Sequence, residues 1–148
     1  MNVQQLMTRD PACCTPTDTA REAAIIMRDR DCGSVPVIED TDSRRLVGMI
    51  TDRDIAVRGI ADGRGSDAPV RDLMSTEPST VGELDDVRAV EQIMSQRQVR
   101  RVPVVDEQGR CIGIIAQADL ARANRVVSNR EVGRVVERIS EPSDEARR

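Results

Sequence analysis

A hydroxyl and a carboxylate three residues apart, at Thr51 and Asp54, are the side chains of this sequence best placed to bind a ligand. They follow a short apolar segment, residues 46–50, and open a second segment that carries Ile55 and Val57. At the start of a helix several backbone N–H groups lack an intrahelical partner, and such a turn can bind a phosphate or ribose hydroxyls. The same two side chains can instead close a capping box, in which each accepts a hydrogen bond from the other residue's backbone N–H. These residues alone leave both interpretations open.

The residue types on which most enzymes and metal sites depend are missing or badly spaced. There is no histidine, and the absence of lysine excludes a Walker-type phosphate-binding loop. Asp52 and Asp54 would point apart on a helix, so they do not form a metal pair. Without a C-x-x-C spacing the cysteines are expected to be small buried hydrophobic residues rather than zinc ligands. They are Cys13, Cys14, Cys32 and Cys111. We expect no catalysis, no metal and no required cofactor.

The composition is that of a globular protein with an aliphatic core. Apolar residues make up 39% of the chain and none of them is aromatic, so the core must consist of Val, Ile, Leu, Met and Ala. A net charge of −4 argues against a nucleic-acid partner, for which a basic surplus is typical. No segment approaches the ~20 apolar residues of a membrane span, and the N-terminus does not resemble a signal peptide. We expect a cytoplasmic protein without membrane contact.

A tandem repeat with a nearly constant spacing runs through most of the chain. The clearest repeated pairs are Asp18 and Asp85, Pro36 and Pro103, Gly48 and Gly113, and Asp54 and Asp119. The last two pairs are slightly closer together than the first two, because one turn is shorter in the second copy. We expect the first repeat at residues 1–62, a linker at 63–69, the second repeat at 70–125, and a C-terminal helix with a polar tail at 126–148.

Helices alternating with short apolar strands predict an α/β layered fold, with each copy arranged β-α-β-β-α. The stripe formed by Ala20, Ala23, Ala24 and Met27 predicts an amphipathic helix over 18–30, and Gly33 is placed to end it. Strands of the first copy are expected at 12–14, 35–38 and 46–50, before a helix over 52–61. The second copy is expected to have a helix over 85–98, with Val87, Val90 and Met94 on one face, and another from residue 117. Its strands are expected at 102–105 and 111–115.

The duplicated pattern resembles a pair of CBS domains, the family named after cystathionine β-synthase. The resemblance covers about residues 1 to 125 and is to CBS pairs that stand alone as small bacterial proteins. It is carried by Val35-Pro36-Val37 followed by Gly48-x-Ile50-Thr51-x-x-Asp54, and by Val102-Pro103-Val104 followed by Gly113-x-Ile115-Ala116-x-x-Asp119. It implies two tandem CBS repeats packed about a pseudo-twofold axis, with two ligand clefts between them.

The resemblance also implies which residues would line these clefts. One cleft would use the carboxylate of Asp54 for ribose, Thr51 and Ser34 near phosphate, and Thr80 and Val81 as the adenine wall. Its departure from the family pattern is Ser34, which carries no charge for phosphate.

The other cleft would use Asp119 and Arg101, with Ala12 and Cys13 as its wall. Its departure is Ala116, which replaces the hydroxyl. An aspartate at 119 without that hydroxyl cannot complete a capping box, which favours a ribose-binding role for it.

The family resemblance implies AMP, ADP or ATP as the ligand, with NAD or S-adenosylmethionine ranked behind them. The expected function is therefore a regulatory or sensor module that binds an adenine nucleotide and acts on an unknown protein target. An alternative from another class is a ligand-free interaction protein, or a stress-response dimer, whose clefts are vestigial. Nucleic-acid binding through the arginines is a third and weaker interpretation.

The apolar surface of the helices predicts a homodimer. Ile25 and Ile26 widen the stripe of the first helix, and Val57 and Ile60 extend the apolar surface of the second beyond a narrow core seam. So small a chain cannot easily bury this much apolar helix surface, and large exposed apolar patches usually mark interfaces. A twofold-symmetric dimer is the commonest way to cover such a patch.

Overall fold

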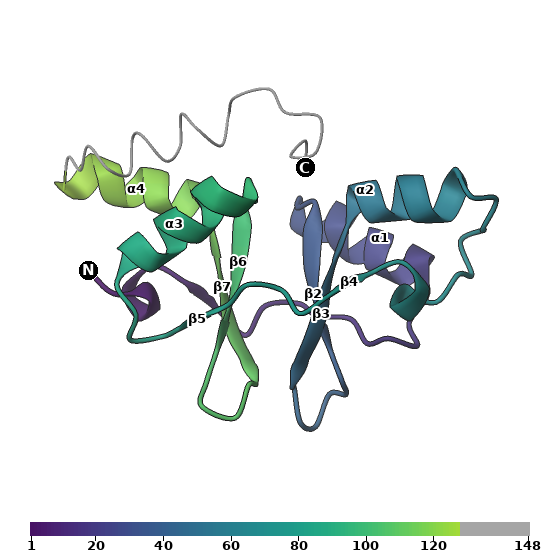
Figure 1. Cartoon of the computed structure of the whole chain (residues 1–148), viewed down its shortest axis with the longest axis horizontal. Coiled ribbons are helices and arrows are strands. Elements are labelled where there is room, and N and C mark those ends of the chain that lie inside the picture. The colour runs from purple at the N-terminus through teal and green to yellow at the C-terminus, as the bar shows by residue number, and fades with distance from the viewer. Residues whose placement is uncertain (128–148) are drawn as a thin grey trace. The chain divides into compact units, whose positions relative to one another are not determined.

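The sequence repeat is also a structural repeat in the computed structural model, which describes residues 1–127. The first copy consists of η1 (Val3–Gln5), β1 (Thr8–Arg9), α1 (Ala20–Arg30), β2 (Ser34–Ile38), β3 (Leu46–Thr51), α2 (Asp52–Asp54) and the π-helix η2 (Ile55–Ile60). The second consists of η3 (Val70–Asp72), β4 (Ser75–Thr76), β5 (Val81–Gly82), α3 (Val87–Arg97), β6 (Arg101–Val105), β7 (Cys111–Ala116) and α4 (Gln117–Val127). This order confirms the predicted α/β class with two repeats (Figure 1).

Helices α1 and α3 begin and end with the same chemistry. The Thr19 hydroxyl accepts a hydrogen bond from Glu22 N at 3.2 Å, and an Asp86 carboxylate oxygen accepts one from Arg88 N at 2.9 Å. Each helix ends at a residue with left-handed backbone geometry, Asp31 with φ 51° and Gln98 with φ 52°. The prediction that Gly33 ends α1 was therefore wrong, because an aspartate adopts the conformation usually taken by glycine.

The buried faces of these two helices agree with the predicted periodicity at most positions. In α1 the side chains of Ala20, Ala23 and Met27 are buried, whereas Ala24 is exposed, contrary to its predicted place in the stripe. In α3 the buried apolar side chains are Val87, Val90 and Met94. The buried face of α1 is therefore one residue narrower than predicted, because Ala24 is exposed to solvent.

Short strands that the periodicity did not predict complete both sheets. The strand order is β1-β7-β6-β5 in one sheet and β2-β3-β4 in the other. The antiparallel pairing of β1 with β7 joins the N-terminal segment to the second copy, whereas β4, from the start of the second copy, pairs with β3. Two-residue strands carry no alternation of apolar and polar residues, so only their hydrogen-bonded partners reveal them.

Glycines make possible the pairing of β1 with β7 and of β4 with β3, in which each short strand joins a strand of the other repeat. A Cβ atom at Gly48 would lie 2.6 Å from the carbonyl oxygen of Ser75, in β4. A Cβ atom at Gly113 would lie 3.0 Å from the carbonyl oxygen of Thr8, in β1. The short strands can approach β3 and β7 this closely because both positions lack a side chain.

The strand predicted at residues 12–14 was largely wrong. Only Cys14 forms a β-bridge, parallel to Val37, with Cys14 N donating to Pro36 O at 3.1 Å. The bridge does not extend, because the next donor to this strand would be the N–H of residue 16, and Pro16 has none. The other strands of the first copy, β2 and β3, begin and end within one residue of their predicted positions.

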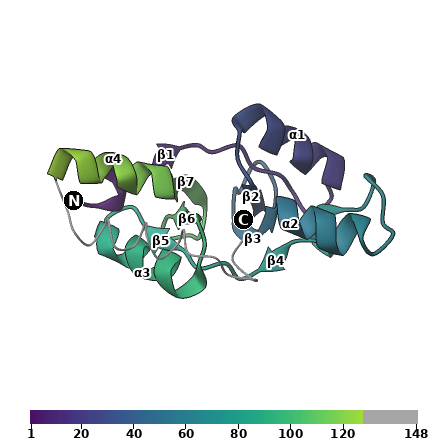
Figure 2. The same cartoon turned by 90° about the horizontal axis from the view of Figure 1, so that it is seen from above.

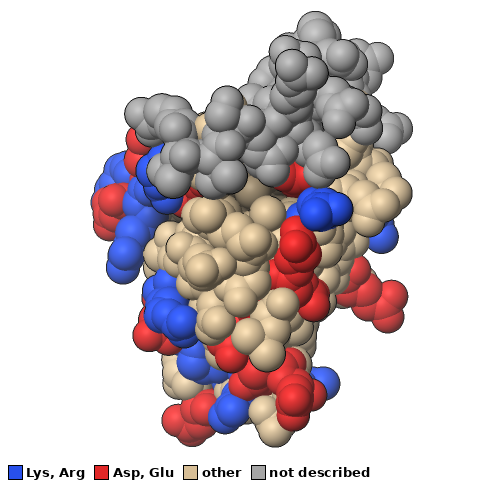
Figure 3. Space-filling view, turned by 90° about the vertical axis from the view of Figure 1, so that its left-hand side faces the viewer, with Lys and Arg blue, Asp and Glu red and all other residues tan. Residues whose placement is uncertain are grey.

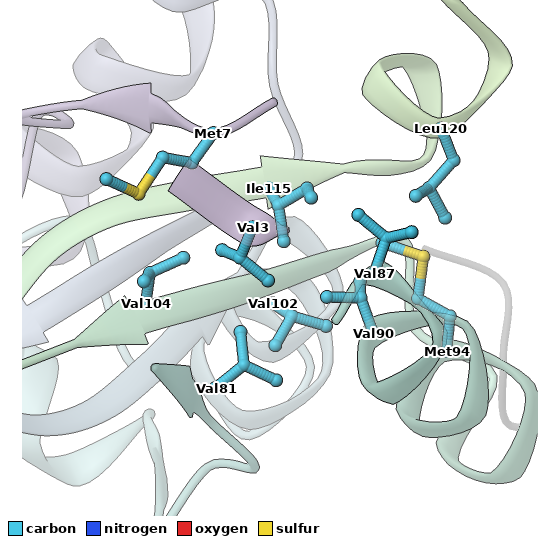
Figure 4. Packing of buried hydrophobic residues seen from close by; sticks show 10 residues of the cluster. All are labelled: Val3, Met7, Val81, Val87, Val90, Met94, Val102, Val104, Ile115 and Leu120. Atoms are coloured by element: carbon cyan, nitrogen blue, oxygen red, sulfur yellow. The ribbon is translucent and has the colours of Figure 1, made fainter. Parts of the chain in front are cut away.

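The described chain forms two compact units. One contains residues 1–10, 79–107 and 112–127, and the other contains residues 11–78 and 108–111. In the first unit α3 and α4 lie beside strands β6 and β7 (Figures 1 and 2). Its core is aliphatic, and Val3 and Met7 of the N-terminal segment pack with Val104 and Ile115 of the second repeat (Figure 4).

The core of the second unit has the same character. Buried side chains from α1, β2, β3 and η3 contribute to it, including Met27, Val35, Val37, Ile50 and Val70. No helix among residues 1–127 is long and apolar enough to span a bilayer. The C-terminal helix and tail predicted at 126–148 lie outside the described residues beyond Val127, the last residue of α4.

Candidate functional site

The turn that joins β3 to α2 contains a complete capping box. The Thr51 hydroxyl oxygen accepts a hydrogen bond from Asp54 N at 3.0 Å, and Asp54 Oδ2 accepts one from Thr51 N at 2.9 Å. Asp54 is buried, with 8% of its surface exposed. The capping box uses the Thr51 hydroxyl oxygen and one Asp54 carboxylate oxygen as acceptors. The hydroxyl still has a proton to donate and the carboxylate has a second oxygen, so each side chain can bind a further partner. The cap and the ligand site are therefore compatible, and the cap holds both side chains in a defined orientation.

An aspartate closes the same kind of turn at four places in the two repeats. In each, a carboxylate oxygen accepts a hydrogen bond from the backbone N–H three residues earlier, at 2.7–2.9 Å. The pairs are Thr15 with Asp18, Thr51 with Asp54, Gly82 with Asp85, and Ala116 with Asp119. A structural role therefore accounts for each of these aspartates, including Asp119, without any ligand.

The carboxylate of Asp119 has a further partner in α4. Its Oδ1 atom forms an ion pair with Arg122, while Oδ2 accepts the hydrogen bond from Ala116 N. Both oxygens of this buried group are therefore engaged within the protein, which sequence reasoning missed although the i, i+3 spacing was visible. In the first repeat the position equivalent to Arg122 is Val57, so Asp54 has no arginine three residues further along its helix.

Ser34 lies beside the capping box in the same sheet. It pairs with Thr51 across β2 and β3, and it is half-buried. The adjacent Gly33 carbonyl oxygen accepts a hydrogen bond from Asp52 N at 2.9 Å. Ser34, Thr51 and Asp54 are thus brought together at one end of the β2–β3 pair. That they form one half of a ligand cleft stays a prediction.

The second repeat has the equivalent turn with different side chains. Gln117 N donates to the carbonyl oxygen of Arg100 at 2.8 Å, which brings the start of β6 next to the start of α4. Arg101 is the first residue of β6 and is half-buried, and Ala116 is the last residue of β7. This half-site offers a guanidinium group in place of a serine hydroxyl and a methyl group in place of a threonine hydroxyl.

The predicted adenine walls belong to the other compact unit in each case. Thr80 and Val81 are in the unit that contains Asp119, whereas Ala12 and Cys13 are in the unit that contains Asp54. Val81 is 3% exposed, and its side chain lies in the aliphatic core (Figure 4). A ligand could therefore contact Val81 only through its backbone, whereas Thr80 is exposed and Ala12 and Cys13 are half-buried.

Surface charge and metal ligands add no other candidate site within the described part of the chain. Residues 1–127 contain no group of three or more His, Cys, Asp or Glu side chains that could hold a metal ion. On the face drawn in Figure 3, basic and acidic side chains are interspersed, so no continuous basic surface lies there. That face offers none of the positive patches that nucleic-acid binding requires.

Comparison with known proteins agrees with the repeat architecture. The model of the CBS domain family matches residues 3–58 and 70–125. The CBS domain-containing protein YhcV of Bacillus subtilis (strain 168) is 40% identical over 139 residues, which are 94% of this chain and 95% of that protein. Hypoxic response protein 1 of Mycobacterium tuberculosis (strain ATCC 25618 / H37Rv) is 36% identical over 120 residues, which are 80% of this chain and 82% of that protein.

Solved structures share the fold. The crystal structure of Hypoxic Response Protein I with two coordinated zinc ions matches with a TM-score of 0.75 at 34% identity, covering 82% of this chain and 98% of that one. The CBS domain pair of protein MJ0100, in complex with 5′-methylthioadenosine and S-adenosyl-L-methionine, matches with a TM-score of 0.75 at 27% identity, covering 86% and 98%. The predicted resemblance is confirmed: the chain belongs to the CBS domain family, as a tandem pair of CBS domains.

Proposed function

We propose that this protein is a regulatory module that binds an adenosine-containing ligand at the Thr51–Asp54 turn. The observation that carries the proposal is the capping box, which orients a hydroxyl and a buried carboxylate beside Ser34. The second oxygen of the Asp54 carboxylate suits the two hydroxyls of a ribose, and a hydrogen bond to a charged group is among the stronger ones in proteins. The related CBS pair of MJ0100 is described in complex with two adenosine-containing molecules, which supports this ligand class.

The two half-sites are proposed to differ in strength. At the second turn the Asp119 carboxylate already pairs with Arg122, and Ala116 supplies no hydroxyl. Arg101 is the feature that favours this turn, since a guanidinium group suits phosphate oxygens. We therefore assign the ribose-binding role first to Asp54 and expect that the Asp119 half-site binds more weakly. AMP, ADP and ATP remain the proposed ligands of this adenosine site.

Thermal unfolding in the presence of candidate ligands tests the proposal directly. A ligand present at 100 times its dissociation constant stabilises the folded protein by about 2.7 kcal/mol, which raises the melting temperature measurably. The screen uses AMP, ADP, ATP, NADH, 5′-methylthioadenosine and S-adenosylmethionine, with guanosine and cytidine monophosphates as base controls. Stabilisation by the adenosine compounds alone supports the proposal. Equal stabilisation by all bases, or none by any compound, refutes it.

A homodimer without a ligand is the second candidate, and exposed apolar side chains favour it. Val57 and Ile60 in the π-helix η2 are 45% and 65% exposed, which is unusual for large aliphatic residues. We propose that a second copy of the chain covers this face. In that case the protein would regulate its target through protein contacts, without catalysis, and ligand screening would give no stabilisation.

A further inference from the structure

Two cysteines and an arginine from three distant parts of the sequence meet in the compact unit that contains α1. They are Cys13 before α1, Arg44 in the turn between β2 and β3, and Cys111 at the start of β7. Arg44 Nη2 donates to Cys13 Sγ at 3.5 Å. The Cys111 side chain lies close enough to the Cys13 thiol to lower its pKa. All four cysteines of the chain are free thiols, so this pair is available for redox chemistry.

Arg44 is held in place by the segment that carries Cys111. Cys111 N donates to Arg44 O at 2.8 Å, and Arg44 Nε donates in return to Cys111 O at 3.3 Å. Arg44 Nη2 also donates to Pro11 O at 3.4 Å, two residues before Cys13. The guanidinium group therefore connects the two segments that contribute the thiols, and its position does not depend on a single contact.

The backbone of Arg44 adopts a conformation that side-chain-bearing residues seldom take. Its φ is 55°, in the left-handed region. The equivalent position in the second repeat is Gly109, which has φ 78° and no steric penalty there. Arginine at this position costs conformational energy that glycine avoids, and such residues cluster at functional sites. Because Gly109 has no side chain, the equivalent turn of the second repeat cannot form the same group of side chains.

The surroundings of Cys13 favour its thiolate form. The Cys111 side chain and the charge of Arg44 together hold the pKa of the Cys13 thiol below its usual range, although partial burial opposes them. The contact that favours the protonated form is the hydrogen bond that the thiol donates to Pro11 O at 3.2 Å. The neighbouring Cys14 is the opposite case, because burial and the nearby Asp18 carboxylate raise its pKa to about 12. Adjacent cysteines therefore differ in their readiness to react.

We propose that Cys13 is a peroxide-reactive thiol and that Cys111 is the thiol that resolves it into an intramolecular disulfide. In the first step the Cys13 thiolate attacks the terminal oxygen of a hydroperoxide, an S–O bond forms, and the O–O bond breaks. The alkoxide or hydroxide that leaves takes a proton from water, and Cys13 becomes a sulfenic acid. The Cys111 sulfur then attacks the Cys13 sulfur, the S–O bond breaks, and the thiol proton of Cys111 leaves with the hydroxide as water. Two thiols are oxidised by two electrons and the peroxide is reduced.

The resulting bond would covalently fix the segment before α1 to the first residue of β7. The oxidation of Cys13 by a peroxide requires no bound nucleotide. The reaction can therefore be followed in the whole 148-residue chain without ligand.

Alkylation and peptide mapping of the reduced protein test the order of reactivity. With limiting iodoacetamide at neutral pH, Cys13 should be carboxamidomethylated several-fold faster than Cys32, which is also half-buried, and Cys14 should react slowest. After one equivalent of hydrogen peroxide and quenching with N-ethylmaleimide, non-reducing digestion should yield a peptide pair joined through Cys13 and Cys111. Reaction of Cys32 or Cys14 as fast as Cys13, or a disulfide between any other pair, overturns the proposal.

Two variants separate the roles of the partners. Cys111→Ser should stop the reaction at a dimedone-reactive sulfenic acid on Cys13, and Cys111→Ala serves as the second variant if the buried serine impairs folding. Arg44→Gln should slow alkylation of Cys13 several-fold and leave Cys32 unchanged. An unchanged rate in Arg44→Gln, or a disulfide that still forms at Cys13 without Cys111, contradicts the assigned roles.

Discussion

Among single residues, Asp54 carries the largest share of the proposed function. One carboxylate oxygen closes the turn after β3 by accepting the hydrogen bond from Thr51 N, and the group is almost fully buried. A neutral side chain at position 54 can still cap the turn if it has an oxygen atom that accepts the hydrogen bond from Thr51 N. Asparagine is such a replacement, so it separates the structural role of the side chain from its charge.

We expect Asp54→Asn to weaken binding of an adenosine ligand by about 1.5–3 kcal/mol, the usual contribution of a hydrogen bond to a charged group. The melting temperature should change little, because the amide oxygen can still accept from Thr51 N. Titration calorimetry with the ligand identified by thermal screening measures the loss. Asp119→Asn is the matched control and should lower affinity less, since its carboxylate already pairs with Arg122. Unchanged affinity in both variants would remove these carboxylates from ligand binding.

Substitutions of Thr51 separate its role as a helix cap from its role in ligand binding. Thr51→Ala should lower the free energy of unfolding by about 1 kcal/mol, because Asp54 N loses its side-chain acceptor. Thr51→Ser retains the hydroxyl and should preserve both stability and affinity. Chemical denaturation and ligand titration of both variants give the comparison. A stable Thr51→Ala protein with lost affinity would show that the hydroxyl serves the ligand alone.

Among the helices and strands, the exchanged short strands depend on two glycines. Strand β4 approaches β3 at Gly48 and strand β1 approaches β7 at Gly113, so each sheet is completed by a segment from the other repeat. The contacts at the two positions are not equally rigid. At Gly48 the nearest atom is a backbone carbonyl oxygen, whereas at Gly113 it is the flexible sulfur of Met7.

We expect Gly48→Ala to destabilise the protein by roughly 1–3 kcal/mol, as overpacking against a fixed backbone does. The new Cβ would lie 2.6 Å from the Ser75 carbonyl oxygen, so β4 must shift. Gly113→Ala should cost less, because the Met7 side chain can move and the Thr8 carbonyl oxygen is 3.0 Å away. Gly65→Ala is the control, since no atom lies within 4 Å of its added Cβ. Equal melting temperatures for the three variants would contradict this account of the exchanged strands.

For the molecule as a whole, we expect a homodimer, because aliphatic side chains of η2 are exposed in the single chain. Ile55 is half-buried and packs against the core, but Val57 and Ile60 face solvent in the single chain. The core therefore does not use all the apolar residues of this helix. A partner surface explains why large aliphatic side chains are kept there.

Sedimentation velocity at micromolar concentration should show a dimer, with twice the chain mass of 16.3 kDa. Ile60→Ser should shift the equilibrium toward the monomer, because it removes the most exposed aliphatic side chain of η2. Leu84→Ser is the matched control: this leucine is 72% exposed but lies outside η2, between β5 and α3. A single species with the mass of one chain would rule out the dimer, and equal effects of both substitutions would place its interface elsewhere.

Features with a local cause could be predicted from the order of the residues alone. The apolar period of residues 87–94 predicted the buried face of α3, and the short apolar segments predicted β2, β3, β6 and β7 within one residue at each end. The Thr51–Asp54 capping box was one of two interpretations open from the sequence, because it needs only two side chains three residues apart. The repeat itself followed from identical residues at a nearly constant spacing.

Contacts between distant segments became visible only in the folded chain. The two-residue strands β1 and β4 have no sequence period of their own, and their partners lie in the other repeat. Likewise nothing local indicates that Arg44 adopts a left-handed backbone or that its guanidinium group lies between Cys13 and Cys111. The period of apolar residues indicates which face of a helix or strand is buried. It does not indicate which segments come into contact, because that depends on the packing of the complete chain.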